Sequence, residues 1–575
     1  MAKKAGTKRA ASKTATPRKP ATQASRPRYK MRVEDDVYVA MPDGVRIACR
    51  IYRPDADGHF PTLYAASPYQ YEYDHVPALP LFPWKETGPI EFYVSRGYVY
   101  IHADVRGSGR SEGEYQFLSA TEQMDSTHMI EWIAAQPWSN GRVGGIGQSY
   151  FGFSQWLMAV NRPPHLTCIA PYDALVDPYR CHGFHGGIYC SYRTMWYIGL
   201  RSNALHRPPD QRRGKDMTTD LGHELTFHDT DDSWWKERSA FERIDRINIP
   251  VLSIGHWAKK ALHLRGNIVG FEYTPTKDKK LVITNYRTQN EVHHAFDTEE
   301  FHAQWLLPFY DRYLHGIQNG YEKLPAVRLG IQGADNLWRE ESEWPLRRAR
   351  MVPFYLRKKK SGSLTSLNDG SLTAAAPARN EGETSYRYPD NQWVNGVVAM
   401  GPNGPDPIKR VLTWTSAPLD EDLEVVGPIV MELWASSTET DTEFFVKLAD
   451  QFPQSPDDRK KGVQPRSFNV SKGWLKASHR EKDAQRSTPT RPFYTHTNPQ
   501  PIAPGEIYEL DIEVLPICYV FKKGHRLRLE LANGDSPATD GVFSHPYHPT
   551  LMGTDTIHHD GAHASRLLLP VMPAG

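Results

Sequence analysis

The stretch VGGIGQSYFGFSQW (residues 143–156) joins an apolar run to a helix-like pattern, with a serine at the junction. Ser149 lies two residues after Gly147 and three residues before Gly152. Glycines around a sharp strand-to-helix turn leave room for a strained backbone and for close approach of neighbouring chain. Such a turn lifts the serine hydroxyl to the N-terminus of the following helix, where backbone N–H groups stabilise an oxyanion. We interpret Ser149 as a candidate nucleophile; the alternative is a glycine-rich turn with an incidental serine.

Strand-like and helix-like runs alternate on both sides of this turn. Apolar segments that end in loops occur at PTLYAASPY (61–69), YVYIHADVRG (98–107) and LTCIAPY (166–172), whereas TEQMDSTHMIEWIAAQPW (121–138) has apolar residues at helical spacing. Alternation of strands and helices is typical of a parallel sheet with helical crossovers. The second glycine comes three residues after the serine rather than two, which departs from the GxSxG pattern. The context nevertheless predicts an α/β-hydrolase domain with Ser149 in its nucleophile elbow.

Changes in residue composition and periodicity divide the chain into predicted domains. Residues 178–245 hold many Trp, Tyr, His and charged residues with little strand pattern, and they predict an inserted helical cap. Later strand-like runs such as VVGPIVMELWASS (425–437) and HRLRLELAN (525–533) predict an all-β jelly roll. The predicted organisation is a disordered basic tail at 1–30, an α/β-hydrolase core at 31–177 and 246–340, a helical cap at 178–245 and a jelly-roll β-sandwich at 345–575.

Composition limits the classes of function. The chain has 575 residues, of which 39% are hydrophobic, so it can bury more than one core. Residues 1–30 carry ten Lys or Arg and no acid, and we interpret them as a solvated tail, with a transit peptide or a nucleic-acid-binding arm as alternatives. No apolar run is long enough for a membrane span. The five scattered cysteines form no CxxC pair, which indicates neither a disulfide framework nor a zinc site and favours a reducing cytoplasm.

Five segments share the motifs of a known family. They are SPY (67–69), ADVRGSGRSEGEY (103–115), EWIAAQPWSNGRVGGIGQSYFG (131–152), SAPLDEDLEVVGPIVMELWASSTETDTEFFVKLAD (416–450) and FKKGHRLRLELA (521–532). Together they resemble the cocaine esterase and X-Pro dipeptidyl-peptidase group of α/β-hydrolases, which includes α-amino-acid ester hydrolases and glutaryl acylases. The resemblance implies an α/β-hydrolase domain, a helical cap and a C-terminal jelly roll. It also implies Ser149 as nucleophile, with the Tyr69 hydroxyl and the Tyr150 backbone N–H as the oxyanion hole.

The orienting acid is the point at which the sequence departs from this family. An activated serine needs a base, and the base needs an acid to orient it. The resemblance implies an acid just after the strand IPVLSIG (249–255), yet residues 246–271 contain no Asp or Glu. The expected position is Ala258 or Ala261, so the acid position is apparently vacant. The sequence leaves open whether the acid has moved, has been lost or has been substituted.

The base is also displaced from its expected position. The nearest histidines are His293 and His294, which are our candidates for the general base, and His263 is a further candidate. Glu291 and Asp297 flank the histidine pair and could replace the missing acid.

The predicted function is a serine hydrolase that cleaves a carboxylic ester or amide through an acyl-enzyme. An X-Pro-type peptidase or acylase is the alternative within the enzyme class, and a non-catalytic ligand-binding protein is the alternative outside it. A peptidase needs a site for the free amine of its substrate, for which Asp229, Asp231 and Asp232 are available. We expect a small-molecule or peptide substrate, no metal or organic cofactor, no nucleic-acid partner and no membrane, and the sequence allows a homo-oligomer.

Overall fold

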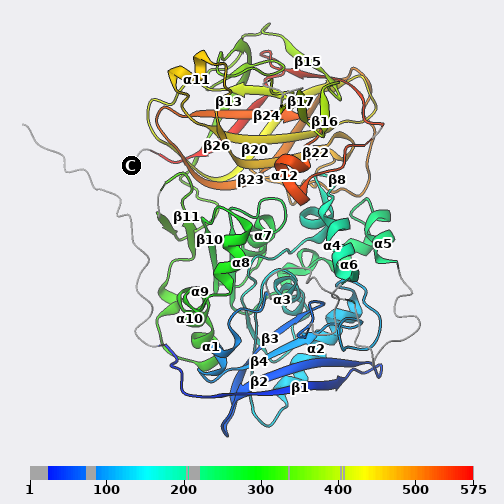
Figure 1. Cartoon of the computed structure of the whole chain (residues 1–575), viewed down its shortest axis with the longest axis vertical. Coiled ribbons are helices and arrows are strands. Elements are labelled where there is room, and N and C mark those ends of the chain that lie inside the picture. The colour runs from blue at the N-terminus through cyan, green and yellow to red at the C-terminus, as the bar shows by residue number, and fades with distance from the viewer. Residues whose placement is uncertain are drawn as a thin grey trace, which may run out of the picture.

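The computed structural model of the chain describes residues 24–72, 86–202, 205, 220–334, 337–401, 404–405, 408–548 and 550–573. Residues 1–23 of the predicted basic tail lie outside these ranges. Two large sheets occupy opposite ends of the molecule's long axis (Figure 1).

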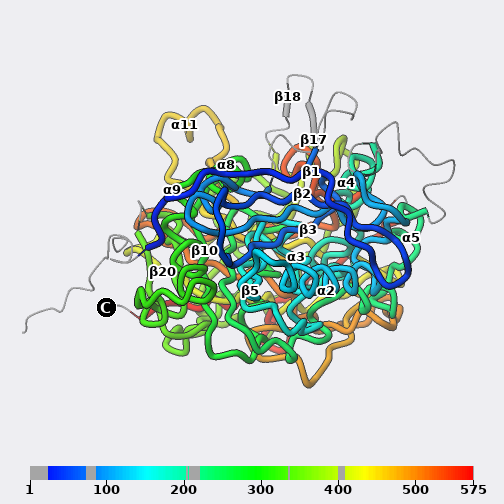
Figure 2. Tube along the Cα trace, turned by 90° about the horizontal axis from the view of Figure 1, so that it is seen from below, coloured from blue at the N-terminus to red at the C-terminus, as the bar shows by residue number. Residues whose placement is uncertain are grey.

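The first sheet contains ten of the described strands, in the order β1-β2-β4-β3-β5-β6-β9-β10-β11-β12. Their bounds are β1 (Met31–Ala40), β2 (Arg46–Pro54), β3 (Phe60–Ser67), β4 (Val99–Asp104), β5 (Ser139–Gly145), β6 (Leu166–Ile169), β9 (Val251–His256), β10 (Lys279–Thr284), β11 (Val327–Gly330) and β12 (Trp338–Glu341). Strands β1 and β2 form an antiparallel pair along one edge (Figure 2). The strands from β4 to β11 are parallel to one another, as the alternation of strands and helices predicts. Their carboxyl ends therefore meet at one edge of the sheet.

Helices pack closely on both faces of this sheet. Adjacent residues of a strand point to opposite faces. A Cβ atom at Gly144 would lie 2.8 Å from Leu314, and one at Gly145 would lie 2.6 Å from Gln155. The two glycines therefore let a helix approach β5 from each side. The helices of this half are α1 (Ile90–Val94), α2 (Ala120–Ala134), α3 (Tyr150–Asn161), α7 (Leu264–Tyr273), α8 (Gln289–Phe296), α9 (Glu299–Phe301), η4 (His302–Leu306), α10 (Leu307–Tyr310), η5 (Asp311–His315) and η6 (Tyr321–Lys323).

Between β6 and β9 the chain leaves the sheet and forms a segment that lies between the two sheets (Figure 1). Its described elements are η1 (Tyr179–Gly183), β7 (Phe184–His185), β8 (Ile188–Tyr189), α4 (Tyr192–Ser202), α5 (Leu221–Phe227), α6 (Ser233–Arg238) and η3 (Phe241–Arg246). We call residues 178–246 the inserted segment. The β7–β8 hairpin turns at Gly186, which has φ 57°. A Cβ atom there would lie 2.1 Å from the carbonyl oxygen of Trp474, so glycine allows the hairpin to touch the second sheet.

The second sheet forms the C-terminal half, and eleven of the described strands pair in the order β15-β25-β20-β23-β22-β21-β24-β19-β14-β13-β26. Their bounds are β13 (Arg350–Lys360), β14 (Gly370–Thr373), β15 (Glu383–Tyr388), β19 (Leu412–Thr415), β20 (Leu423–Ser437), β21 (Glu443–Gln451), β22 (Ser467–Lys476), β23 (Tyr508–Phe521), β24 (Arg526–Ala532), β25 (Gly553–His558) and β26 (Arg566–Val571). A smaller sheet and short helices accompany them: β16 (Trp393–Asn395), β17 (Val398–Gly401), β18 (Gly404–Pro405), α11 (Pro456–Lys460), η7 (Ala477–His479), α12 (Pro537–Asp540) and η8 (Gly541–Phe543). This β-rich half agrees with the strand-like runs of the sequence.

The two halves share a buried apolar cluster. Trp257, Leu264 and Leu281 of the first half pack with Val426 and Cys518 of the β-rich half. The β-rich half therefore supports the loop after β9, to which Trp257 belongs. Within the described residues, no helix is both long enough and apolar enough to cross a bilayer.

Candidate active site

Ser149 lies in a strained turn between β5 and α3. Its backbone has φ 58° and ψ −116°, and non-glycine residues rarely adopt a positive φ. Its amide donates to the carbonyl oxygen of Tyr172 over 3.1 Å, which fixes the turn. A Cβ atom at Gly147 would lie 2.4 Å from Cβ of Phe151, so this position requires glycine. The structure thus contains the sharp strand-to-helix turn that the sequence predicts.

The second glycine of the motif allows a neighbouring loop to come close. A Cβ atom at Gly152 would lie 2.6 Å from Cβ of Ala174 and 3.0 Å from the carbonyl oxygen of Tyr172. Both residues belong to the loop that follows β6. The absence of a side chain at Gly152 therefore allows that loop, which contains Asp173, to pack against the start of α3.

Ser149, His263 and Asp173 form a continuous chain of polar contacts. The Ser149 hydroxyl oxygen is 3.4 Å from Nε2 of His263, and Nδ1 of His263 is 3.1 Å from Oδ2 of Asp173. His263 immediately precedes α7, and both it and Asp173 are at most 1% exposed. A hydroxyl, an imidazole and a carboxylate in this order can perform nucleophilic catalysis on an acyl group.

The histidine that contacts Ser149 is not one of the two expected first. Nε2 of His293 is 2.8 Å from Nζ of Lys259, and His294 is exposed on α8. Burial, reinforced by the charge of Lys259, lowers the pKa of His293 to about 2, which makes this imidazole a weak proton acceptor. The structure corrects the expectation for His293 and His294, and it favours His263, the further candidate of the sequence.

Asp173 is the residue that sequence reasoning missed. It follows the strand β6, at the carboxyl edge where functional residues of parallel sheets gather, and this position was the available signal. Ala258 and Ala261 lie in the loop between β9 and α7, as His263 does, and their side chains carry no acid. Glu291 instead accepts the backbone N–H of Arg287 at the start of α8. The carboxylate beside the imidazole therefore comes from a different strand from the one expected.

Three donors surround one oxygen of Asp173. Oδ2 lies 3.1 Å from Nδ1 of His263, 3.1 Å from Nε2 of Gln148 and 3.3 Å from Nζ of Lys259. Burial alone would raise the pKa of this carboxyl, but the charge that His263 carries when protonated, together with the charge of Lys259, outweighs burial and holds the pKa well below its usual value. Asp173 is therefore a carboxylate at neutral pH. Asn267 of α7 accepts the N–H of Ala174 over 3.0 Å and so fixes the loop.

Burial also sets the charge of His263. It lowers the pKa of the imidazole below the usual 6.5; Lys259 acts in the same direction, and Asp173 opposes both. His263 is therefore neutral at pH 7, the state in which Nε2 can accept a proton.

Tyr69 and Tyr150 lie beside Ser149. The Tyr69 hydroxyl accepts a hydrogen bond from Nε1 of Trp196 over 2.9 Å, and the two tyrosine rings are 6.0 Å apart. Burial, with the charge of Glu86 next in size, raises the pKa of Tyr69 well above its usual value, so the phenol keeps its proton. Tyr150 begins α3, which places its backbone N–H beside the serine.

A small cavity with mostly aromatic walls covers these groups. It is lined by Tyr69, Phe117, Ser149, Tyr150, Phe153, His182, Tyr192, Trp196, Leu262 and His263. His182, Tyr192 and Trp196 come from the inserted segment, so that segment shapes the space in front of the serine.

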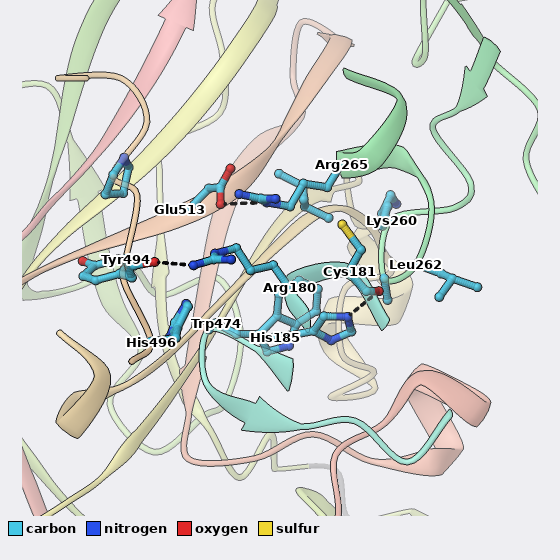
Figure 3. Close-up of a pocket in the computed structure, with 14 residues that line it drawn as sticks. Arg180, Cys181, His185, Lys260, Leu262, Arg265, Trp474, Tyr494, His496 and Glu513 are labelled. Carbon is cyan, nitrogen blue, oxygen red and sulfur yellow. Dashed lines mark hydrogen bonds and ion pairs between the residues drawn. The ribbon is translucent and has the colours of Figure 1, made fainter. Parts of the chain in front are cut away.

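A larger cavity, with an empty volume of about 580 Å³, lies between the inserted segment, the loop before α7 and the β-rich half (Figure 3). Leu262 lines both cavities. The larger one carries charged walls, which include Arg180, Lys260 and Glu513.

The three aspartates proposed for an amine site have other partners. Asp231 pairs with Arg180 over 2.7 Å, and Asp232 accepts the N–H of Trp234 at the start of α6. The backbone oxygen of Asp229 accepts the hydroxyl of Tyr179. The structure assigns these residues to the folding of the inserted segment.

Two family models match the chain. Residues 43–287 match the X-Pro dipeptidyl-peptidase (S15 family) model, and residues 319–568 match the X-Pro dipeptidyl-peptidase C-terminal non-catalytic domain. The chain belongs to this group of serine hydrolases. The family prediction is thereby confirmed, and the second model covers the β-rich half.

Individual relatives agree with this membership. Cocaine esterase of Rhodococcus sp. (strain MB1 Bresler) is 29% identical, over 94% of this chain and 98% of that protein. A CocE/NonD family hydrolase of Staphylococcus aureus has a TM-score of 0.76 at 25% identity, over 94% of each chain. An α-amino acid ester hydrolase has a TM-score of 0.70 at 21% identity, over 96% of this chain and 98% of that one, and shows the same fold. The chain therefore has the CocE/NonD hydrolase fold with a C-terminal β-rich domain.

Proposed function

We propose that this serine hydrolase cleaves a carboxylic ester through an acyl-enzyme, with Ser149 as nucleophile, His263 as general base and Asp173 as the orienting acid. The chain of contacts from Ser149 through His263 to Asp173 is the observation that carries the proposal. The charged state of Asp173 and the neutral state of His263 support it, because this pairing is the resting state that proton transfer requires.

In the proposed mechanism, Nε2 of His263 takes the proton of Ser149 as its oxygen attacks the substrate carbonyl. Asp173 stabilises the imidazolium that forms. The Tyr69 hydroxyl and the Tyr150 N–H donate to the oxyanion of the tetrahedral intermediate. His263 then gives its proton to the leaving alcohol, and the acyl-enzyme remains. Water repeats the sequence in the second half, with His263 as base, and releases the acid and the free serine.

Replacing Tyr69 with phenylalanine removes one proposed oxyanion donor but keeps the ring. We expect kcat to fall by about 10²-fold or more, because the lost hydrogen bond acts mainly on the transition state, and we expect KM to change little. Steady-state hydrolysis of a p-nitrophenyl ester measures both. Tyr71→Phe is the matched control, since the Tyr71 hydroxyl donates to Asp36 instead. Equal kcat values for Tyr69→Phe and the native chain would remove the phenol from the oxyanion hole.

The pH dependence of the reaction should follow His263. Because its pKa lies below 6.5, the acid limb of kcat/KM should also lie below pH 6.5. Lys259 lowers that pKa, so Lys259→Met should raise it and move the acid limb to higher pH. Lys280→Met is the control, because Nζ of Lys280 donates to Leu324 near the other end of β10. An acid limb that stays in place in Lys259→Met would contradict the assignment of the base.

The aromatic walls of the small cavity support an ester with an apolar acyl or alcohol group. Phe117, Phe153 and Trp196 offer flat apolar surface close to Ser149. The name of the Rhodococcus relative, cocaine esterase, describes an ester substrate for that protein. Esters of aromatic acids are therefore the first substrates to assay.

A peptidase or acylase is the second candidate, and Glu86 is the observation that favours it. This buried carboxylate is near enough to raise the pKa of both Tyr69 and Tyr192 in the small cavity. A carboxylate in that place could bind the free amine of a peptide. A peptidase would cleave an X-Pro p-nitroanilide with a higher kcat/KM than a matched ester, and Glu86→Gln would raise KM for that anilide alone. An esterase would show the opposite substrate preference.

The same proposal covers the finer architecture. We propose that the inserted segment acts as a helical cap, because it supplies three residues that line the small cavity, and that the C-terminal sheet folds as a jelly roll.

A non-catalytic binding protein is the remaining alternative. Labelling of the native chain by a fluorophosphonate, with no labelling of Ser149→Ala, would exclude a non-catalytic protein.

The five cysteines are buried free thiols, which supports a reducing compartment such as the cytoplasm.

A further inference from the structure

Two histidines and a cysteine converge outside the cavity in front of Ser149. His185 ends β7 and Cys190 follows β8, so both belong to the inserted segment, whereas His545 comes from the loop after η8 in the β-rich half. One ligand atom of each residue lies within 4.8 Å of the other two. The three side chains are buried, with at most 4% exposed. We call them the His185–Cys190–His545 cluster.

Each imidazole of the cluster has an oxygen acceptor behind it. Nδ1 of His545 lies 2.9 Å from Oδ2 of Asp535, and the other oxygen of that carboxylate accepts the backbone N–H of His545 over 2.8 Å. Nε2 of His185 lies 3.3 Å from the carbonyl oxygen of Cys181 (Figure 3). An N–H that donates to a carboxylate or a backbone carbonyl is the usual support behind a metal-binding histidine, because it fixes the tautomer.

These outer hydrogen bonds leave the two inner nitrogens without a proton between them. Nδ1 of His185 and Nε2 of His545 are only 2.9 Å apart. If each outer nitrogen carries the ring's single proton, two lone pairs face each other at that distance. Moving the proton of His185 to Nδ1 would instead set a bare Nε2 against the Cys181 carbonyl oxygen. An extra proton or a metal ion between the two rings would satisfy both of them.

The position of Cys190 favours a metal ion over an extra proton, because its sulfur lies within 4.8 Å of a ligand nitrogen of each imidazole. A metal ion differs from a proton here because it also converts the Cys190 thiol to a thiolate. The two charges of Zn²⁺ are then balanced by Cys190 and Asp535, which leaves the buried site neutral.

We propose that His185, Cys190 and His545 bind a Zn²⁺ ion that joins the inserted segment to the β-rich half. Zinc binds imidazole nitrogens at about 2.0–2.1 Å and thiolate sulfur at about 2.3 Å. Tetrahedral angles at those lengths place two nitrogens roughly 3.3 Å apart, so the rings need to separate by a few tenths of an ångström and the thiolate to move inward. On binding, the Cys190 proton goes to solvent, and a water molecule fills the fourth position.

The position of the cluster links the ion to the catalytic cavity. His182, three residues before His185, lines the cavity in front of Ser149, and so does Trp196 on the helix that follows Cys190. His185 also lines the larger cavity, which provides a route for the ion (Figure 3). Bound zinc would thus fix the β7–β8 hairpin, which connects His182 to the helix that carries Trp196. The sequence did not indicate this site because His545 comes from a distant part of the chain and no short motif connects the ligands.

Metal analysis and cobalt spectroscopy of the full chain test the proposal. We expect about one zinc per chain by mass spectrometry after reconstitution with Zn²⁺ and desalting. Co²⁺ in place of zinc should give the intense visible bands of a tetrahedral site and a thiolate charge-transfer band in the near ultraviolet. Native chain that binds no zinc, or cobalt spectra without the thiolate band, would overturn the proposal.

Variants assign the ligands. Cys190→Ser should lose the thiolate band and bind zinc about 100-fold more weakly, and Asp535→Asn should weaken binding about 10–100-fold through His545. Cys518→Ser is the matched control, since it removes another buried thiol. Ser149→Ala should keep the zinc, which separates this site from the proposed catalysis. Zinc should raise the Tm of the native chain but not that of Cys190→Ser; an equal rise in both would place the ion elsewhere.

Discussion

Replacing His263 with alanine is expected to lower kcat for ester hydrolysis by about 10⁴-fold or more, with the fold intact. The imidazole is the only group whose contact with the Ser149 hydroxyl is seen among the described residues, and without a base the hydroxyl is a weak nucleophile at neutral pH. The residual rate would come from substrate binding and the oxyanion donors. Steady-state turnover of a p-nitrophenyl ester and the rate of fluorophosphonate labelling measure the effect.

His293→Ala is the matched control for this result. It removes the histidine that the sequence favoured and that bonds Lys259 instead of Ser149. We expect this variant to keep kcat within about tenfold of the native value, because Lys259 and Asp173 still contact each other. The reverse ranking, with His293→Ala inactive and His263→Ala active, would assign the base to the loop after β10.

Replacing Asp173 with asparagine is expected to lower kcat by about 10⁴-fold. The amide is nearly isosteric, but it no longer stabilises the imidazolium and it allows the wrong tautomer of His263. Its effect on KM should be small because Asp173 does not line the cavity in front of Ser149. The measurement is again steady-state turnover, with circular dichroism to show that the variant is folded.

Two further variants separate Asp173 from the alternatives raised by the sequence. Glu291→Gln removes an acid beside the histidine pair and should leave kcat nearly unchanged, since Glu291 is bonded at the start of α8. Ala261→Asp introduces a carboxylate at one of the two positions that the family resemblance implies, and it should give no gain, because the carboxylate is already supplied after β6. A large gain in Ala261→Asp, with Asp173→Asn fully active, would show that the acid is absent from the native chain.

The turn that bears Ser149 could be predicted because its causes are local. The glycines of VGGIG are needed for helix packing on both faces of β5, and Gly147 is needed for the turn itself. These requirements lie within a few residues of the serine, so they are visible in the sequence. The alternation of strands and helices likewise reflects local periodicity, which explains why the parallel sheet was predicted.

The sequence could not single out His263 among its candidate bases, and it missed Asp173, because both contacts depend on how distant loops meet. The loops expected to carry the acid and the base contain Lys259 and His293, which bond each other. The actual carboxylate comes from the neighbouring loop after β6. Besides the position of Asp173 after β6, Gly152 was a local sign of this change, since a Cβ atom there would lie 2.6 Å from Cβ of Ala174 in that loop. Predicting this contact from Gly152 would have required knowledge of which segment of the chain packs against it.

The structure of the enzyme after reaction with an aryl phosphonate ester tests the central claim most directly, because the phosphonyl group imitates the tetrahedral intermediate. We predict phosphorus bonded to the Ser149 oxygen, His263 as the nearest imidazole, and the phosphonyl oxygen within hydrogen-bond distance of the Tyr69 hydroxyl and the Tyr150 N–H. Phosphorus on another side chain, or His293 in place of His263 beside the adduct, would contradict the account.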